Sequence, residues 1–396
     1  MRFQIWRCIT KLTRTRKKNT KSIIGTQGVQ AILCAIAKTY ASVKTVCIGG
    51  INASNVQRVL YQASPASKPL DGVAIVSAIV AAESPKDAAS SLLSLIKSTA
   101  PFVATAMSTK SSSASILLEN VPQIVANVAE KTPLSHNMTN LVVQNFAANV
   151  ALSIGASPIM ANYGMEATDL CKLGGALVVN MGTVTPDGIL QYIRAIQAYN
   201  LVGGPVVFDP VGAGATAVRR GAVKELMAAG YFSLIKGNEN EIRTVFGETG
   251  VVQRGVDSGA STLDAKGRAK LARDLAAREK TVVLMTGRVD YVSDGVNTVA
   301  ISNGCELLGE ITGSGCVLGT ICSAMLAVER ADRLAAVVAG CLMYEIAAER
   351  AVEGKDDLGP GSFVPALIDG LYGIRKLSLS GKLDWVKAAK VEFVEL

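Results

Sequence analysis

The sequence predicts an α/β protein whose main part is a doubly wound sheet with helices on both faces. Hydrophobic residues make up 49% of the 396 residues and aromatic residues only 5%, with Ala, Val, Gly and Leu dominant. This composition suits buried parallel strands. From about residue 116, short apolar runs alternate with stretches of helical periodicity, and polar residues follow the apolar runs. Ligands of such sheets bind beyond the carboxyl ends of the strands, so this order predicts a site at that edge.

Length and charge indicate how many domains the chain has and which partners it can bind. The length suggests two or three domains. The net charge is +8, but residues 1–22 hold eight Lys and Arg and no acid, so the remainder is formally neutral. The body therefore offers no electrostatic case for nucleic-acid binding. The basic segment 1–22 is a mitochondrial targeting peptide, a disordered tail or a misplaced gene start.

Two further features concern membranes and compartment. No window of the sequence holds eighteen uninterrupted apolar residues, so we expect no membrane span. The eight Cys residues are scattered and form no CxxC pair, which indicates reduced thiols in an intracellular compartment. We expect a cytoplasmic protein, with the mitochondrion as the alternative that the basic segment leaves open.

Residues 23–100 show consecutive β/α units. Two expected strands end in Gly49-Gly50 and in Val76-Ser77, and turns of this kind hold phosphate at the strand ends of β/α barrels. The expected elements are helix 27–40, strand 44–48, helix 54–62, strand 72–76 and helix 85–97.

A polar stretch rich in Ser, Thr and Lys, residues 101–115, predicts a linker to a second domain, residues 116–396. The expected elements of that domain are helix 139–153, strand 176–180, helix 185–200, strands 205–208, 231–235 and 281–285, an edge hairpin of 290–293 with 298–302, and three largely apolar helices after residue 316.

Residues suited to binding metal and phosphate follow the expected strands of this domain. The carboxylates Asp209 and Glu241 can hold Mg²⁺ directly or through water, since Mg²⁺ takes few carboxylates and keeps several waters. Lys236 offers a cation to a triphosphate, or is an exposed charge at a strand end. Asn238 faces the same side as Glu241 at a helix start, or is an N-cap. Thr286 also lies at a strand end.

The stretch Thr312-Gly313-Ser314-Gly315-Cys316 opens an apolar helix. Its glycines let the backbone approach a ligand closely, and the N–H groups of the helix start favour an anion such as phosphate. The same groups should lower the pKa of the Cys316 thiol. The alternative is an ordinary Gly-rich turn with a buried structural Cys, since short Gly motifs have a high false-positive rate.

The first domain resembles the C-terminal part of thiamine-phosphate synthase, a TIM barrel, in residues 24–29, 46–52 and 70–79. This resemblance implies a thiazole-phosphate site at Gly49, Gly50, Val76 and Ser77. It covers about three of eight β/α units and lacks the strands that carry the pyrimidine-diphosphate and Mg²⁺ ligands. Three units cannot close a barrel, so we expect a partial TIM barrel without synthase activity. A helper domain and a truncated gene model stay open.

Residues 120–375 resemble the hydroxyethylthiazole kinases of the ribokinase-like superfamily. The order of a synthase remnant followed by this kinase is also that of the fungal bifunctional enzymes of thiamine biosynthesis. The resemblance rests on motifs in one order: Met138-Thr139-Asn140, Gly155 to Met160, Asn180-Met181-Gly182-Thr183, Asp209 to Ala215, Lys236-Gly237-Asn238 with Glu241-Ile242, Gly255 to Ser258, Thr286-Gly287 with Asp290-Tyr291-Val292, Thr312 to Cys316, and Gly359 to Phe363.

The resemblance implies a role for each site residue. Cys316 is the catalytic residue, standing where most of the superfamily has an Asp base. Lys236 stands where the family more often has Arg, so a bidentate grip becomes a point charge. The implied sets are Asn140, Met160 and Gly313 for the thiazole, Lys236, Asn238, Thr286 and Gly315 for ATP, and Asp209 and Glu241 for Mg²⁺.

We therefore expect Mg²⁺- and ATP-dependent phosphorylation of the hydroxyl of 5-(2-hydroxyethyl)-4-methylthiazole. The resemblance also implies a homotrimer with small-molecule substrates, and no nucleic-acid or membrane partner. Three alternatives stay open: a fully bifunctional synthase and kinase, a non-catalytic binder of thiazole phosphate, and a kinase for hydroxymethylpyrimidine.

Overall fold

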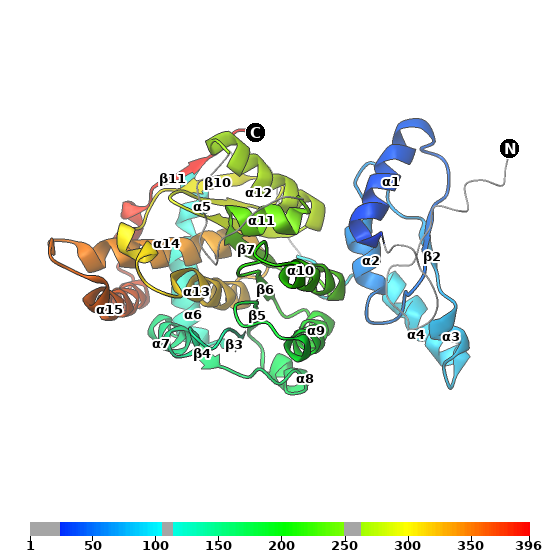
Figure 1. Ribbon diagram of the computed structural model, residues 1–396, viewed down its shortest axis with the longest axis horizontal. Helices are drawn as coiled ribbons and strands as arrows, with labels where there is room; N and C mark the ends of the chain where they lie inside the picture. The colour runs from blue at the N-terminus through cyan, green and yellow to red at the C-terminus, as the bar shows by residue number, and fades with distance from the viewer. Residues whose placement is uncertain (1–23, 105–113, 249–262) are drawn as a thin grey trace. The chain divides into compact units, whose positions relative to one another are not determined.

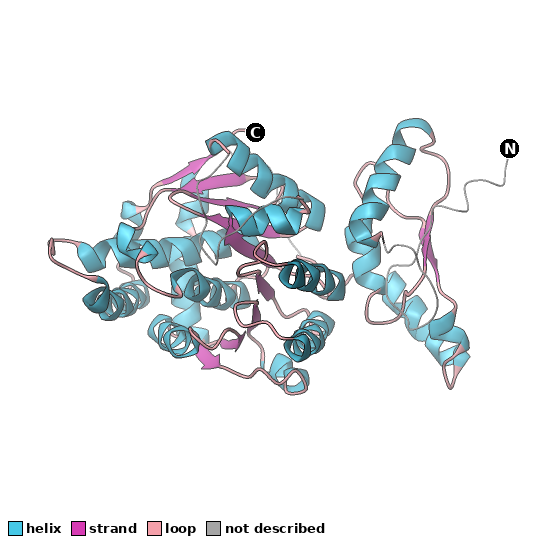
Figure 2. Cartoon of the chain, in the orientation of Figure 1, coloured by secondary structure: helices cyan, strands magenta, loops and turns pink. Residues whose placement is uncertain are grey.

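The computed structural model describes residues 24–104, 114–248 and 263–396. The basic segment 1–22 and most of the expected linker lie outside these ranges. The chain forms two compact units, the first ending at Val103 and including Ala228–Gly230, the second holding the other residues from Ala104 onward, and each is described by itself. Figure 1 labels their helices and strands, and Figure 2 colours them by type.

The N-terminal unit contains two β/α units in which the strands pair in parallel. Val46 pairs with Gly72, so the turns that follow the two strands lie at the same edge. Apolar side chains such as Leu33, Val56 and Val59 form a small core of its own. The elements are α1 (Gly25–Thr39), β1 (Val46–Ile48), α2 (Val56–Ala63), β2 (Gly72–Ala74), α3 (Ser77–Val80) and α4 (Pro85–Lys97). The predicted order of helices and strands is confirmed, although β2 is shorter than expected and α3 is additional.

The C-terminal unit is built on a nine-stranded sheet in the order β11-β10-β9-β8-β7-β6-β5-β3-β4. The strands from β4 to β8 are parallel, and β9, β10 and β11 are antiparallel. The strands are β3 (Leu134–Met138), β4 (Ser157–Ile159), β5 (Ala176–Asn180), β6 (Val206–Asp209), β7 (Leu234–Asn238), β8 (Val282–Thr286), β9 (Asp290–Ser293), β10 (Thr298–Ile301) and β11 (Val391–Phe393).

Helices cover both faces of this sheet, as predicted (Figure 1). One layer holds α6 (Val121–Lys131), α7 (Gln144–Ile154), α13 (Ser314–Val328), α14 (Arg333–Val352) and α15 (Pro360–Leu379). The other holds α8 (Ala167–Leu170), α9 (Pro186–Leu201), α10 (Ala217–Ala229), α11 (Glu239–Phe246) and α12 (Ala265–Glu279). Helix α5 (Ala114–Glu119) and the 3₁₀ helices 171–173, 306–309 and 383–388 complete the unit.

The core of this unit lies between the sheet and α13 and α14. Strand residues such as Val207 and Leu284 and helix residues such as Ile321 and Leu342 are fully buried. Helix α14 is buried along nearly its whole length because α13 and α15 pack on either side of it. Burial on all sides explains why the sequences of α13 and α14 are apolar all round.

The strand order of the sheet reverses at β3. The chain continues from β3 to β4 on one side and from β5 to β8 on the other, so the strand order reverses there. Ligands of open α/β sheets bind at such a reversal, beyond the carboxyl ends of the strands. Asn140 follows β3, and Asn180 and Asp209 end β5 and β6.

Candidate active site

The strand ends bring most of the predicted site residues to one edge of the sheet. Asn180 pairs in register with Asp209 across β5 and β6. Asn238 pairs in register with Thr286 across β7 and β8. The residues predicted for metal and ATP therefore lie on neighbouring strands, beside the start of α13.

A continuous polar network joins Asn140 and Cys316, predicted for the substrate, to Asp209, predicted for Mg²⁺. The Asn140 amide donates to Cys316 Sγ at 3.4 Å and to Asn180 Oδ1 at 3.0 Å. The Asn180 amide donates to Asp209 Oδ2 at 2.9 Å, and Lys236 Nζ lies 3.2 Å from the same oxygen. Asn180, Asp209 and Lys236 are buried, so the network is rigid and shielded from water.

Lys236 thus forms a buried ion pair with Asp209. The alternative that Lys236 is an exposed charge at a strand end is wrong. Burial acts to lower its pKa, but the neighbouring Asp209, Cys316 and Glu241 together outweigh this and hold the pKa above the ordinary value. A Cβ added at Gly315 would lie 3.5 Å from Lys236 Nζ, so the ammonium group lies directly beneath the turn at the start of α13. The positive charge and the helix start therefore face the same place.

The turn before α13 depends on Gly313. Its φ of +87° is in the left-handed region, which glycine adopts at little cost. A Cβ there would also lie 2.6 Å from Val143 Cγ2. Tyr344 Oη donates to the Ser314 carbonyl at 3.0 Å and ties this turn to α14. The predicted helix start that exposes N–H groups is confirmed.

The predicted acidity of Cys316 is wrong. Burial raises the pKa of its thiol to about 11, and the nearby Asp209 carboxylate adds to this, while Lys236 only partly compensates. The helix start does not overcome the loss of water around the sulfur. Cys316 is therefore a neutral thiol at pH 7 in the free protein, and it can orient a substrate hydroxyl by hydrogen bonding.

The two carboxylates predicted for Mg²⁺ differ in how many of their oxygens already accept hydrogen bonds. Asp209 Oδ1 is buried and has no hydrogen-bond partner among the described residues, so it has free ligand capacity. Glu241 Oε1 accepts from the Gly212 N–H and Oε2 from the Asn238 N–H, both at 2.8 Å. Burial and Asp209 raise the pKa of Glu241 to about 7. The residues fit an ion that Asp209 binds directly and Glu241 holds through water.

Asn238 is the N-cap of α11, as its alternative reading predicted. Its side chain accepts from the Glu241 N–H at 3.0 Å, and Glu241 reaches back to the Asn238 N–H, which completes a capping box. Asn238 and Glu241 thereby fix the turn after β7. The ATP contact of Asn238 stays a prediction.

The remaining predicted residues lie further from this network. Met160 follows β4 and is half-buried against the hydrophobic core. The structure gives no contact between Met160 and Asn140 or Cys316 among its described residues, so its thiazole role stays a prediction. In the N-terminal unit Gly49 and Gly50 have φ of +108° and +68°, and Val76 and Ser77 are exposed at the same edge.

Two residues of the site lacked an assigned role at the sequence level. Asn180 links Asn140 to Asp209, and its position at the end of a buried strand was the available signal. Arg219 of α10 donates to the carbonyls of Met181, Val211 and Gly182 at 2.7–2.8 Å. It clamps the turns after β5 and β6 together, and nothing local in the sequence marks this contact.

Within the described residues, every helix is too short or too polar to cross a membrane. The chain was then compared with known proteins. The model of the "Hydroxyethylthiazole kinase family" matches residues 125–376. The "Probable thiamine biosynthetic bifunctional enzyme" of Schizosaccharomyces pombe is 39% identical over 98% of this chain and 75% of that enzyme's length.

Kinases of single function are also similar to the C-terminal unit. The "Hydroxyethylthiazole kinase" of Pyrococcus furiosus is 42% identical over 64% of this chain and 92% of its own length. The solved structure of the hydroxyethylthiazole kinase from Pyrococcus horikoshii OT3 is 37% identical, with a TM-score of 0.61 over 70% of this chain and 100% of its own. The chain therefore belongs to the hydroxyethylthiazole kinase family.

Proposed function

We propose that the chain transfers the γ-phosphoryl group of Mg²⁺-ATP to the hydroxyl of 5-(2-hydroxyethyl)-4-methylthiazole in thiamine biosynthesis. The observation that carries this proposal is the network from Cys316 through Asn140 and Asn180 to Asp209, with Lys236 beneath the start of α13. It places a hydroxyl-orienting group, a cation and an anion-binding turn at one edge of the sheet.

The chain's own residues do three things in this reaction. Cys316 and Asn140 orient the substrate hydroxyl. The N–H groups at 313–316 and Lys236 stabilise the negative charge that spreads over the transferred phosphoryl group. The new O–P bond forms as the bond to the ADP oxygen breaks, and the hydroxyl proton passes late in the reaction to an oxygen of the transferred phosphoryl group. A neutral thiol is compatible with this chemistry because phosphoryl transfer depends mainly on positioning and charge stabilisation.

Mg²⁺ belongs to the proposal as the ion that two carboxylates of this chain would hold. Asp209 would hold it through its unpartnered Oδ1, and Glu241 through water. The ion neutralises phosphate charge when it is bound. We further propose that Thr286 and Gly315 contact the triphosphate, which the position of Thr286 beside Asn238 and of Gly315 beside Lys236 supports.

The N-terminal unit is proposed to bind a phosphate at Gly49-Gly50 and Val76-Ser77 without completing a synthase. The positive φ of both glycines and the shared edge of the two turns support phosphate binding. Two paired strands supply too little of a barrel for the second substrate. This 396-residue chain should form no thiamine phosphate from the two phosphorylated halves, and robust product would overturn this part.

The homotrimer is likewise a proposal, which rests on the resemblance together with exposed apolar residues beside the site. Leu141 and Val142 follow Asn140 and are 69% and 73% exposed, as expected of residues that a second copy covers. Light scattering should give the mass of three chains of 41.2 kDa. A monomer at micromolar concentration would contradict it.

A substrate panel tests the kinase assignment. The full chain should phosphorylate the thiazole alcohol far faster than hydroxymethylpyrimidine, and Asp209→Asn should reduce the rate by at least about a hundredfold. Arg194→Gln, a change on α9 outside the network, is the matched control. Faster turnover of the pyrimidine would replace the substrate, and ATP-independent binding of thiazole phosphate alone would favour the non-catalytic alternative.

A further inference from the structure

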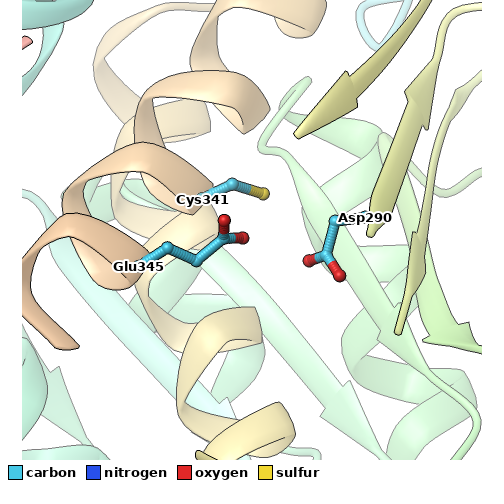
Figure 3. Close-up of side chains that lie close together, drawn as sticks. All are labelled: Asp290, Cys341 and Glu345. Atoms are coloured by element: carbon cyan, nitrogen blue, oxygen red, sulfur yellow. The ribbon is translucent and has the colours of Figure 1, made fainter. Parts of the chain in front are cut away.

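A second cluster of ligating side chains lies in the core of the C-terminal unit, apart from the network described above. Asp290 at the start of β9 and Cys341 and Glu345 of α14 each offer a ligand atom, and these atoms lie within 4.8 Å of one another. Figure 3 shows the sulfur of Cys341 and the carboxylate of Glu345 directed from one helix towards Asp290. All three residues are buried.

Glu345 is the unusual member of this cluster. Its residue is 5% exposed, and neither of its carboxylate oxygens makes a hydrogen bond of normal geometry to a described residue, although the Asp290 carboxyl lies close enough to raise its pKa beyond the effect of burial. A buried carboxyl group whose one polar neighbour is a second carboxyl group is costly, because it has given up water for little in return. An unmet acceptor pointed into a cluster of other ligands indicates that something further binds there.

The arrangement suits a metal ion in several ways. Cys341 and Glu345 are four residues apart on α14, which places both side chains on one face of the helix, a spacing common in metal sites. Asp290 Oδ1 accepts from the Gly287 N–H at 2.8 Å, as a metal-binding carboxylate commonly does. Cys322 of α13 is a close neighbour of Cys341 and raises the pKa of the Cys341 thiol, so it is the candidate for a fourth donor.

The donor set decides which ion fits. A thiol with two carboxylates suits a divalent transition metal, whereas Mg²⁺ and Ca²⁺ prefer oxygen alone. Zn²⁺ takes Cys and carboxylate ligands at about 2.0–2.3 Å in a tetrahedral site. Separations of up to 4.8 Å must close by roughly 1 Å for such a site, which small side-chain rotations of Glu345 and Cys341 supply.

We propose that Asp290, Cys341 and Glu345, with Cys322 as the fourth donor, form a structural Zn²⁺ site that fastens β9 to α13 and α14. Burial raises the pKa of Asp290 to about 6 and the pKa of Glu345 well above its ordinary value. Two buried carboxyl groups cannot both ionise without a cation, and the ion removes that obstacle. Metal binding therefore releases protons and weakens as the pH falls.

The site bears on the kinase through its position. Asp290 holds the Thr286-Gly287 turn, and α13 begins at the Ser314 turn that Tyr344 of α14 also holds. An ion between these elements fixes the distance between the predicted ATP turn and the anion-binding turn. The proposal stands whether or not the kinase assignment does, because its test measures metal and not turnover.

Cobalt provides the test, since Co²⁺ replaces Zn²⁺ and absorbs in the near ultraviolet only when a thiolate binds it. The full chain is produced in medium with Zn²⁺ or Co²⁺ and passed over a chelating resin, and its metal content and absorption are measured. We expect one ion per chain and a thiolate–cobalt band. Cys341→Ala should lose both, and the isosteric Glu345→Gln should weaken retention by at least about tenfold.

Two control variants test whether the effect is specific to Cys341. Cys171→Ala removes another buried thiol of the same unit, and Cys316→Ala removes the thiol of the candidate active site. Both should keep the ion and the band. If Cys341→Ala fails to fold, the metal content of the wild-type chain and of Glu345→Gln still tests the proposal. The proposal would be overturned if the wild-type chain holds no metal above the blank, or if the cobalt band survives Cys341→Ala. The carboxyl groups of Asp290 and Glu345 would then be a protonated pair without a metal.

Discussion

At the residue scale, Cys316 is the residue that we propose orients the substrate hydroxyl. Its thiol is neutral and hydrogen-bonded by Asn140, so its removal should cost less than removal of a full general base. We expect Cys316→Ala to lower kcat by about tenfold to a hundredfold with little change in KM for ATP. The backbone N–H groups that hold phosphate are retained in Ala.

Cys316→Asp tests the same position from the other side. It should keep or raise activity, because Asp supplies the usual base of the superfamily and Lys236 is near enough to offset its charge. Steady-state kinetics of the three proteins measure this. Wild-type activity of the Ala protein together with an inactive Asp protein would make Cys316 a packing residue.

The residue scale also shows what the sequence could reveal. The positions of Asp209, Asn238 and Glu241 at or just after the strand ends were predicted because polar residues that follow an apolar run carry a local signal. The pKa of Cys316 was wrongly predicted because it depends on burial and on Asp209, a residue far away in the chain. The role of Asn180 was missed for a similar reason, since both of its partners come from other strands.

At the element scale, the start of α13 relies on the backbone of Gly313. Gly313→Ala combines an unfavourable φ of +87° with a Cβ 2.6 Å from Val143, so the turn must shift. We expect kcat/KM to fall by at least about tenfold, since small displacements of catalytic groups are costly. Gly309→Ala is the matched control, because a Cβ there meets nothing within 4 Å. Equal effects of both changes would contradict a special role for Gly313.

The pairing of β1 with β2 depends on an acid at their start. Asp71 accepts from the Lys44 ammonium and the Thr45 N–H, both at 2.8 Å, and these bonds lower its pKa to about 2. A depressed pKa stabilises the fold above the ordinary value of 3.8, and this stabilisation is lost as the pH falls towards 2.

Asp71→Asn should therefore lower the melting temperature of the N-terminal unit at pH 6 and make no difference near pH 2. A fluorophore on the exposed Cys34 of α1, with Cys8 replaced by Ser, reports on this unit. Lys86→Gln is a surface control that should show no such pH dependence. A difference between wild type and Asp71→Asn that stays constant from pH 6 to pH 2 would contradict the assignment.

Elements with strong local patterns were predicted, and elements set by distant pairing were not. The helix after Thr185-Pro186 was predicted because Thr185 caps it, accepting from the Gly188 N–H at 3.0 Å. Strand β3 was missed because its sequence, Leu-Ser-His-Asn-Met, is too polar to read as buried, although its polar side chains are satisfied by hydrogen bonds. Strand β11 was also missed, so β10 is not the edge of the sheet.

At the scale of the whole molecule, the kinase site is contained in the second unit. The network residues and the core that supports them all lie after residue 114. A chain of residues 114–396 should therefore keep kcat within about twofold of the full chain, as expected for units with separate cores. Kinetics and thermal unfolding of both proteins measure this. A folded fragment without activity would show that the first unit contributes to the kinase site.

Transfer of a labelled γ-phosphoryl group from ATP tests the central claim most directly. The purified full chain is incubated with labelled ATP, Mg²⁺ and 5-(2-hydroxyethyl)-4-methylthiazole, and the products are separated. We predict labelled thiazole phosphate in proportion to ADP, none without Mg²⁺, and almost none with Asp209→Asn. Release of labelled inorganic phosphate alone, or no transfer by a folded protein, would contradict the claim.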